Sequence, residues 1–255
     1  GAVRCIALPC QKRSAFAKTI NEHPLHLQTL ADLDTEYLAG FLLAFKVVEL
    51  LGKEENNVTN TDEYALFRLL LPLAKLYTAK QHQAVIAEAM ECIGGIAYIE
   101  DSGIPKYYRD AMALVIWEGT TNVLSLDALR AIQKENSFFP YVDDIKKRLA
   151  SVTLDSLSAL KEKVSLSLAN IEEYLPMAMS EGVDFIQAGA RKFSYSLAQT
   201  YIASLMLEFA EYSHSYNDQR ALIATNRFCK RNLVPLIKPY ETYRNNTRLL
   251  FEQAW

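Results

Sequence analysis

The chain has 255 residues, of which 50% are hydrophobic and 22% are charged, and its formal net charge is −3. This composition is typical of a soluble globular protein, and the small negative charge excludes a general attraction to nucleic acid or to an anionic membrane. The length suits one large domain or two modest ones. Only nine glycines are present, and apolar residues recur at helical spacing over long stretches, so the sequence predicts an all-α protein.

The cysteines show neither metal-site spacing nor the pattern of a disulfide framework. They are Cys5, Cys10, Cys92 and Cys229. We expect a reducing compartment, and the sequence does not distinguish the mitochondrial matrix from the cytoplasm. No stretch approaches the ~20 apolar residues of a membrane span, and we do not interpret the basic, apolar N-terminus as a signal peptide.

The first long helix is predicted from Pro24 to Leu51, after a short helix and a turn over residues 1 to about 20. Proline fits the first helical turn, and Gly52 is expected to end the helix. One stripe of this helix carries large apolar side chains, which we expect to form the core of a helical bundle rather than a cofactor site. The stripe consists of Leu30, Leu33, Tyr37, Phe41, Phe45 and Val48.

A second helical run is predicted over residues 61–93, after a polar loop at residues 53–60. Pro72 should kink this run or mark a join between two helices, because proline removes a helical hydrogen bond. A glycine pair and a further loop follow. We expect Arg109 and Asp110 to order that loop without pairing with each other, since adjacent residues on a helix do not face one another.

The sequence Trp117-Glu118-Gly119-Thr120-Thr121-Asn122 places a carboxylate in a tight turn before a helix. Glycine gives the backbone freedom to turn, and one of the two threonines can cap the helix. A carboxylate against apolar walls loses hydration and becomes a better general base. The alternative is that Glu118 merely occupies a helix N-terminus, where negative charge is favoured. These six residues alone favour the alternative.

The part of the chain beyond Lys134 is predicted to be helical as well. Residues 136–140 suggest a linker, and apolar spacing predicts helices near 157–171, 186–209 and 218–233. Prolines then precede a last helix that ends near Trp255. The aromatic residues on these helices are expected to pack in the core.

Two blocks of sequence resemble the C-terminal helical domain of the acyl-CoA dehydrogenases, which are FAD enzymes. The first block, at residues 13–18, is similar to the family's Arg-x-x-Phe-Gly-Lys segment, with alanine at position 17 where glycine is usual. The second block contains a Gly-Gly pair, an aromatic residue, Arg-Asp, and an aromatic residue followed by Glu-Gly-Thr. It consists of Gly94-Gly95, Tyr98, Arg109-Asp110 and Trp117-Glu118-Gly119-Thr120. Residues 68–75 and 88–95, together with the helical extension, resemble the AidB-like, adaptive-response branch of the family.

The resemblance implies a four-helix-bundle acyl-CoA dehydrogenase domain over residues 1–134 and an AidB-like helical extension over residues 135–255. It also implies α,β-desaturation of a fatty acyl-CoA, in which Glu118 removes the α-proton and the β-hydride passes to FAD. Arg13 and Phe16 would reach FAD, often that of a neighbouring subunit. Glu91 stands where most of the family carries glutamine, so it would contact another part of the cofactor or none of it. The full set assigned to the cofactor is Arg13, Phe16, Glu91, Gly94, Gly95, Trp117, Thr120, Thr121 and Asn122.

The family encloses FAD between this helical domain and a middle β-domain, which follows an N-terminal helical domain. No strand-rich region of the sequence could replace them. We therefore expect either the C-terminal part of a longer protein or a chain that depends on a partner. The expected partners are a fatty acyl-CoA, further copies of the chain in a dimer or tetramer, and, as a candidate, an electron-transfer flavoprotein. The competing class is a non-catalytic helical module that binds an acyl ligand or FAD, or that builds an oligomer.

A basic face in the extension raises the question of DNA, to which AidB-type proteins have been linked. Arg227, Lys230 and Arg231 share a helical face, and further basic residues follow at positions 238, 244 and 248. Acidic residues are nearly as many over residues 131–255, and no base-reading motif is present. We therefore favour a solvated face over a DNA site.

Overall fold

The structure is a computed structural model that describes residues 13–237 and residue 247. Its described part consists of eight α-helices, four short 3-10 helices and one small hairpin, which confirms the all-α prediction. The α-helices are α2 (Pro24–Glu55), α3 (Thr61–Ile93), α4 (Ile104–Leu114), α5 (Thr121–Glu135), α6 (Phe138–Ser151), α7 (Ser158–Ser180), α8 (Val183–His214) and α9 (Arg220–Cys229). The 3-10 helices are η1 (Ile20–Glu22), η2 (Gly95–Tyr98), η3 (Glu100–Ser102) and η4 (Asp155–Leu157), and the hairpin pairs β1 (Ser14–Ala15) with β2 (Lys18–Thr19) in antiparallel register.

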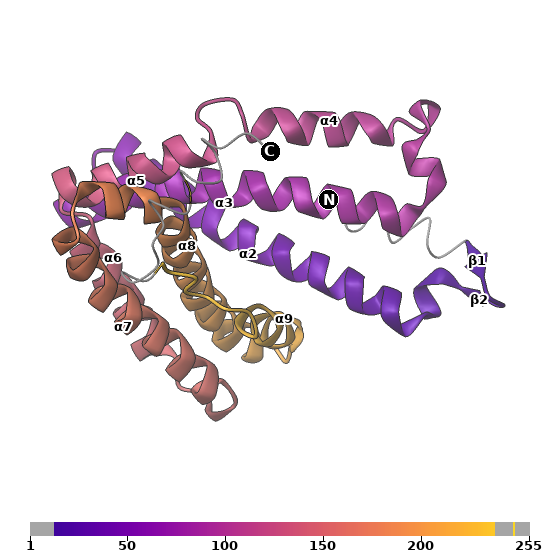
Figure 1. Ribbon diagram of the computed structural model, residues 1–255. Coiled ribbons are helices and arrows are strands. Elements are labelled where there is room, and N and C mark those ends of the chain that lie inside the picture. Colours follow the sequence, from indigo (N-terminus) through magenta and orange to yellow (C-terminus); the bar gives the residue numbers. More distant parts are fainter. Residues whose placement is uncertain (1–12, 238–246, 248–255) are drawn as a thin grey trace.

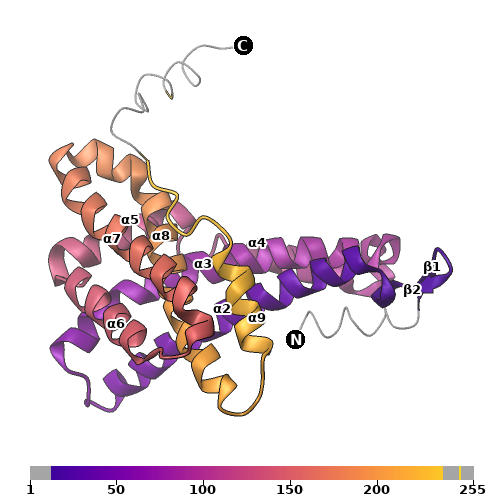
Figure 2. The same ribbon diagram turned by 90° about the horizontal axis from the view of Figure 1, so that it is seen from below.

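The molecule has a compact body and a projecting arm. Helices α5 to α8 gather at one end, whereas α2, α3 and α4 run alongside one another toward the hairpin at the other end (Figures 1 and 2). We call residues 13–32 and 80–118 the arm. Few arm residues are buried, namely Ile86, Ala89, Ala97, Pro105 and Ala111. The arm is therefore thinly packed by comparison with the body.

One large hydrophobic cluster forms the core of the body. It takes side chains from α2 and α3, such as Leu43 and Leu73, and from α5 to α9, such as Phe193 and Phe228. Helix α8 packs against α2, α3, α5, α6, α7 and α9, which explains why so many of its residues are buried. The predicted helical domain and the predicted extension thus share a single core.

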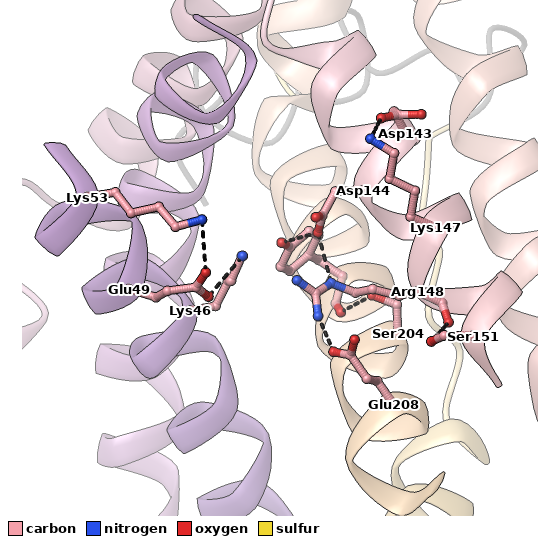
Figure 3. A network of polar contacts seen from close by, with 11 residues as sticks. Lys46, Glu49, Lys53, Asp143, Asp144, Lys147, Arg148, Ser151, Ser204 and Glu208 are labelled. Carbon is pink, nitrogen blue, oxygen red and sulfur yellow. Dashed lines mark hydrogen bonds and ion pairs between the residues drawn. The ribbon is translucent and has the colours of Figure 1, made fainter. Parts of the chain in front are cut away.

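A network of polar side chains joins α6 to α8 at the edge of this core. Arg148 reaches between Asp144, at 2.8 Å, and Glu208 (Figure 3). The Tyr201 hydroxyl donates a hydrogen bond to Asp144 at 2.6 Å. Burial, followed by the nearby Asp144 carboxylate, raises the pKa of Tyr201 well above its ordinary value, so the phenol stays a proton donor.

The predicted apolar stripe of α2 is the main error in the fold prediction. Leu33 is buried, but Tyr37 is 50% exposed and Phe45 is 57% exposed. Phe41 and Val48 are exposed as well. The residues that α2 buries are Leu33, Thr35, Ala39, Leu43, Val47 and Leu50. Helix α2 carries apolar side chains on more than one face, so helical periodicity alone cannot say which face meets the core.

The end of α2 and the start of the extension also differ from the prediction. Gly52 lies inside α2, which continues to Glu55, and the left-handed residue after the helix is Asn57, with φ 55°. Helix α3 continues through Pro72 without a break. Residues 138–140 begin α6 instead of completing a linker. Pro140 is tolerated there because the first N–H groups of a helix have no helical acceptor.

The described helices include none that is both long enough and apolar enough to cross a membrane. Over the same residues, no group of three or more His, Cys, Asp and Glu side chains is placed to hold a metal ion.

Candidate functional site

The turn between α4 and α5 carries Glu118. The Ile116 and Trp117 amides both donate to the Ala113 carbonyl, at 3.1 and 3.0 Å, and so close the turn. Glu118 itself has φ 57° and Gly119 has φ 112°. A left-handed conformation costs a non-glycine residue about 1–2 kcal/mol. The turn therefore holds a strained carboxylate residue next to a glycine, and such strain often occurs at functional positions.

The Glu118 turn is open to solvent in this chain. Glu118 is exposed, and neighbouring Trp117 is 62% exposed. Among the described residues, Glu118 has no hydrogen-bond or ion-pair partner. The apolar walls expected around this carboxylate are thus not supplied by the described part of the chain, and an enclosed site would need further polypeptide.

The start of α5 leaves backbone donors available. Thr120 occupies the N-cap position, but it makes no side-chain cap hydrogen bond, so the predicted hydroxyl cap is absent. Thr121 is buried, and its carbonyl accepts a hydrogen bond from the Ser125 hydroxyl at 2.7 Å. Asn122 is exposed on the first turn. Uncapped N–H groups at a helix start favour an anionic or carbonyl ligand.

The hairpin at the end of the arm displays Phe16. Phe16 and Ala17 form its two-residue turn with φ values of 52° and 63°, the left-handed pair of a type I′ turn. The Phe16 ring is 94% exposed and meets the His23 ring edge-on at 6.3 Å. The glycine that the family usually carries at position 17 therefore has a local explanation, because glycine adopts this conformation without strain.

Arg13 closes against the end of α3. Its Nη1 donates to the Ile93 carbonyl at 2.5 Å. Gly94 has φ 83°, and a Cβ built there would lie 2.6 Å from the same Nη1. A Cβ at Gly95 would meet nothing within 4 Å. The close approach expected at the glycine pair thus occurs at Gly94, and it is made by Arg13. Glu91 is exposed one turn earlier.

The residues assigned to the cofactor fall into two groups within this chain. Arg13, Phe16, Glu91 and the glycine pair lie at the hairpin end of α4, whereas residues 117–122 follow its opposite end. The 11 residues of α4 separate the groups by about 16 Å at 1.5 Å per residue. Figures 1 and 2 show the hairpin and α5 toward opposite ends of the molecule. One chain alone therefore does not assemble both groups around one ligand.

Arg109 and Asp110 lie within α4, where the sequence suggested a loop, and Arg109 orders the segment that precedes this helix. Its guanidinium donates to both carboxylate oxygens of Glu100, at 2.7 and 3.2 Å. This pair ties η3 to α4. Asp110, on the adjacent position, is exposed.

An apolar groove of about 490 Å³ runs between α2 and α3 and ends at Leu114. Leu114 is four residues before Glu118, so the groove is lined in part by the helix that precedes the turn. Among its lining residues, Glu36 pairs with Arg231, which follows α9, and accepts a hydrogen bond from the Tyr77 hydroxyl at 3.0 Å. The lining residues are Glu36, Tyr37, Gly40, Phe41, Ala44, Lys75, Thr78, Ala79, Gln81, His82, Val85 and Leu114.

Sequence reasoning missed this groove because it interpreted Tyr37 and Phe41 as core residues. It also missed Lys75, whose Nζ donates to the Leu114 carbonyl at 2.5 Å. No local pattern marks such a contact between α3 and α4. The i, i+4 spacing of Tyr37, Phe41 and Phe45 on α2 was the available signal, but the same spacing is equally typical of a buried stripe.

Two of the basic residues at the end of α9 and just after it, Arg227 and Arg231, pair with side chains of α2. Arg227 donates to Asp32 at 2.8 and 3.0 Å and to Gln28 at 2.8 Å, and Arg231 pairs with Glu36. Two of the three basic residues considered for DNA thus serve helix packing, while Lys230 is exposed. These ion pairs compensate the charges of Arg227 and Arg231 within the chain. The downstream basic residues at positions 238, 244 and 248 lie outside the described residues.

Two protein-family models match the chain. The acyl-CoA dehydrogenase C-terminal domain matches residues 2–133, and the acyl-CoA dehydrogenase 11 C-terminal domain-like family matches residues 137–251. Acyl-CoA dehydrogenase family member 11 of Caenorhabditis elegans is 34% identical over 231 residues, which cover 88% of this chain and 37% of that protein. Putative acyl-CoA dehydrogenase AidB of Escherichia coli strain K12 is 29% identical over 133 residues, which cover 52% of this chain and 24% of that protein.

Solved structures extend the likeness over the whole chain. Caenorhabditis elegans ACDH-11, in complex with C11-CoA, is 30% identical with a TM-score of 0.93, and the match covers 99% of this chain and 44% of that one. An acyl-CoA dehydrogenase from Bacillus anthracis complexed with FAD has a TM-score of 0.75 at 19% identity and covers 90% of this chain and 43% of that one, which shows a shared fold only. The chain therefore spans less than half the length of these relatives.

Proposed function

Because the chain belongs to the acyl-CoA dehydrogenase family, we propose that it is the C-terminal part of an FAD-dependent protein that desaturates a fatty acyl-CoA between Cα and Cβ. The observation that carries this proposal is the Glu118 turn. It holds a carboxylate in a strained, exposed conformation, directly before a helix start with uncapped donors. The remaining walls would come from the rest of a longer polypeptide or from a partner chain.

In this proposal Glu118 removes the α-proton, which the adjacent thioester carbonyl acidifies. When bound, FAD would supply the acceptor for the hydride that leaves Cβ. Trp117 would shield the Glu118 turn from water, and the first amides of α5 would hold polar groups of the cofactor. Enclosure of the turn by the acyl chain and the missing walls would remove water from the carboxylate and strengthen local electrostatics.

The separation of the two residue groups supports a site shared between copies of the chain. The hairpin exposes Phe16 near one end of α4, and the Glu118 turn follows the other end of this helix. A homo-oligomer would place the hairpin of one copy against the cofactor held by another. Helix α2 and the arm expose further apolar residues, which a dimer or tetramer would cover.

Flavin absorbance tests the proposal in the longest natural form of the protein. The purified protein should be yellow and should bleach when a fatty acyl-CoA is added. Glu118→Gln preserves size and should keep the flavin bound but slow bleaching by about 10²–10⁴-fold, the usual contribution of a general base. Asp110→Asn, on exposed α4, is the matched control and should bleach normally. A Glu118→Gln protein that bleaches like the parent would remove Glu118 from the role of base.

The second candidate is a binding or assembly module without turnover. It is favoured by the open position of Glu118 and by the apolar surface of the arm. A protein that binds FAD or acyl-CoA, assembles into oligomers and does not bleach would support this candidate over desaturation.

A further inference from the structure

We propose that Lys75 is a positioning residue that latches the end of α4 and thereby fixes the turn that carries Glu118. The catalytic meaning of this latch rests on the proposed function. The latch itself is a contact between α3 and α4, and it can be tested without any turnover.

The latch satisfies a helix end that would otherwise lack a partner. Leu114 is the last residue of α4, and the last four carbonyls of a helix have no intrahelical donor. The Lys75 ammonium donates to the Leu114 carbonyl at 2.5 Å, across 39 positions of sequence. A cation is favoured at this end of a helix because the helix dipole is negative there. The next residues form the turn itself, since the Ile116 and Trp117 amides bind the carbonyl of Ala113.

The two sides of the latch differ in how firmly they are held. Around Lys75, α3 lies in the body core, with Leu73 and Tyr77 fully buried. Tyr77 is held further by its hydrogen bond to Glu36, which Arg231 neutralises. Helix α4, in contrast, buries only Pro105 and Ala111 among its residues. Gln83 of α3 also donates to Met112 Sδ of α4 at 2.7 Å, but Lys75 holds the last carbonyl of α4, next to the turn. This contact therefore fixes the end of a weakly packed helix to a rigid one.

The turn needs such support because its conformation is strained. Glu118 has φ 57°, and a strained residue keeps its conformation only where its surroundings determine it. Without the latch, the turn should relax to other backbone states. The Glu118 carboxylate would then leave its position relative to the start of α5.

Trp117 offers a direct reporter of the turn. The chain has two tryptophans, so a Trp255→Phe background leaves Trp117 alone. In this background we compare Lys75→Met, Lys75→Arg and the control Lys134→Met, which is exposed on the last turn of α5. Time-resolved fluorescence anisotropy follows the motion of Trp117. In Lys75→Met, the part of the decay that follows tumbling of the whole molecule should shrink, and the part due to fast local motion should grow. Lys75→Arg, which can still donate to Leu114, and Lys134→Met should match the parent. Unchanged anisotropy in Lys75→Met overturns the latch.

The bleaching rate of the flavin-loaded, natural-length protein tests the positioning role. Lys75→Met should bleach at least about 10-fold more slowly at saturating acyl-CoA, with unchanged acyl-CoA affinity, and Lys75→Arg should restore the rate, because a misplaced catalytic group costs rate rather than binding. An unchanged rate overturns the positioning role even where the anisotropy falls. If the parent protein never bleaches while Lys75→Met still shows the anisotropy loss, the latch stands and the proposed function fails.

Discussion

Gly94 is the residue whose backbone most clearly requires glycine. It combines φ 83° with an Arg13 guanidinium that would lie 2.6 Å from any Cβ. We expect Gly94→Ala to lower the free energy of unfolding by about 1–2 kcal/mol, because the alanine is strained and Arg13 must leave the Ile93 carbonyl. Urea unfolding followed by circular dichroism measures the change.

Gly95→Ala is the matched control for this substitution. Its Cβ would meet nothing within 4 Å, and Gly95 is the first residue of a 3-10 helix. A change within about 0.5 kcal/mol is therefore expected, as for an ordinary surface substitution. Equal losses in both variants would show that the Arg13 hydrogen bond to Ile93 does not require a glycine at position 94.

Residue identity indicated the positive φ of Gly94, but it did not indicate every residue with a left-handed backbone. Phe16, Ala17 and Glu118 all have positive φ values, yet none is a glycine or an asparagine. Sequence reasoning assigned the turn at residue 118 to Gly119 alone, because glycine is the usual signal for such a conformation. Nothing in the identity of residue 118 signals its positive φ of 57°.

At the scale of helices, the connection between α2 and α3 is held by one carboxylate, that of Glu63. Glu63 accepts from the Asn60 amide at 3.2 Å and from Lys53 at 2.6 Å, while the Asn60 side chain accepts from the Glu63 amide at 2.9 Å. The Lys53 hydrogen bond, followed by the Asn60 amide, holds the pKa of the Glu63 carboxyl below its ordinary value. Ionised Glu63 therefore stabilises the fold above its unfolded-state pKa, and this contribution is lost as pH falls through the folded-state pKa.

Glu63→Gln should isolate the charge, because glutamine can keep the capping box. At pH 7 the variant should lose about 0.5 kcal/mol of unfolding free energy, the usual size of a partly exposed ion pair. At about pH 3, below the ordinary glutamate pKa, the difference between the variant and the parent should be smaller, and it should vanish once pH lies below the lowered folded-state pKa. Urea unfolding at both pH values is the measurement, with Glu55→Gln on the exposed end of α2 as the control. A loss that persists unchanged at low pH would exclude the charge as its cause.

Helix prediction succeeded for the long helices and their order, but it missed α4 and α6 and it failed for the buried face of α2. The runs that became α2, α3, α7 and α8 were all predicted, because long apolar periodicity marks them. The predicted buried face of α2 was wrong because the core takes Ala39, Leu43 and Val47 in place of the larger aromatics. Helix α6 was missed because Asn136 and Pro140 signal a turn, and only Asn136, with φ 52°, forms one.

The whole molecule divides into a well-packed body and an arm with much apolar surface. The arm exposes large apolar side chains that include Phe16, Tyr98 and Trp117, whereas the body buries α8 on nearly every side. Exposed apolar surface of this extent is typical of a protein region that meets further polypeptide. The sequence predicted the helical class, but it could not predict this asymmetry, because the pairing of distant helices decides which apolar faces are covered.

The shared core makes a prediction about the division at residue 134. Helix α8 packs against α2, α3 and α5, and the buried Tyr141 hydroxyl of α6 donates to the Leu197 carbonyl of α8 at 2.9 Å. A fragment of residues 1–134 would expose the faces of α2, α3 and α5 that α8 covers. Removing this cover should cost more than the roughly 5–15 kcal/mol that keeps a typical domain folded.

We therefore expect the fragment to aggregate or to lose cooperative thermal unfolding, and co-expression with residues 135–255 should restore a soluble complex with native helicity. Circular dichroism, calorimetry and size-exclusion chromatography provide the measurements. A soluble 1–134 fragment with native helicity and a sharp calorimetric transition would mean that the first unit folds by itself. The residues beyond 134 would then be an added domain and not half of one core.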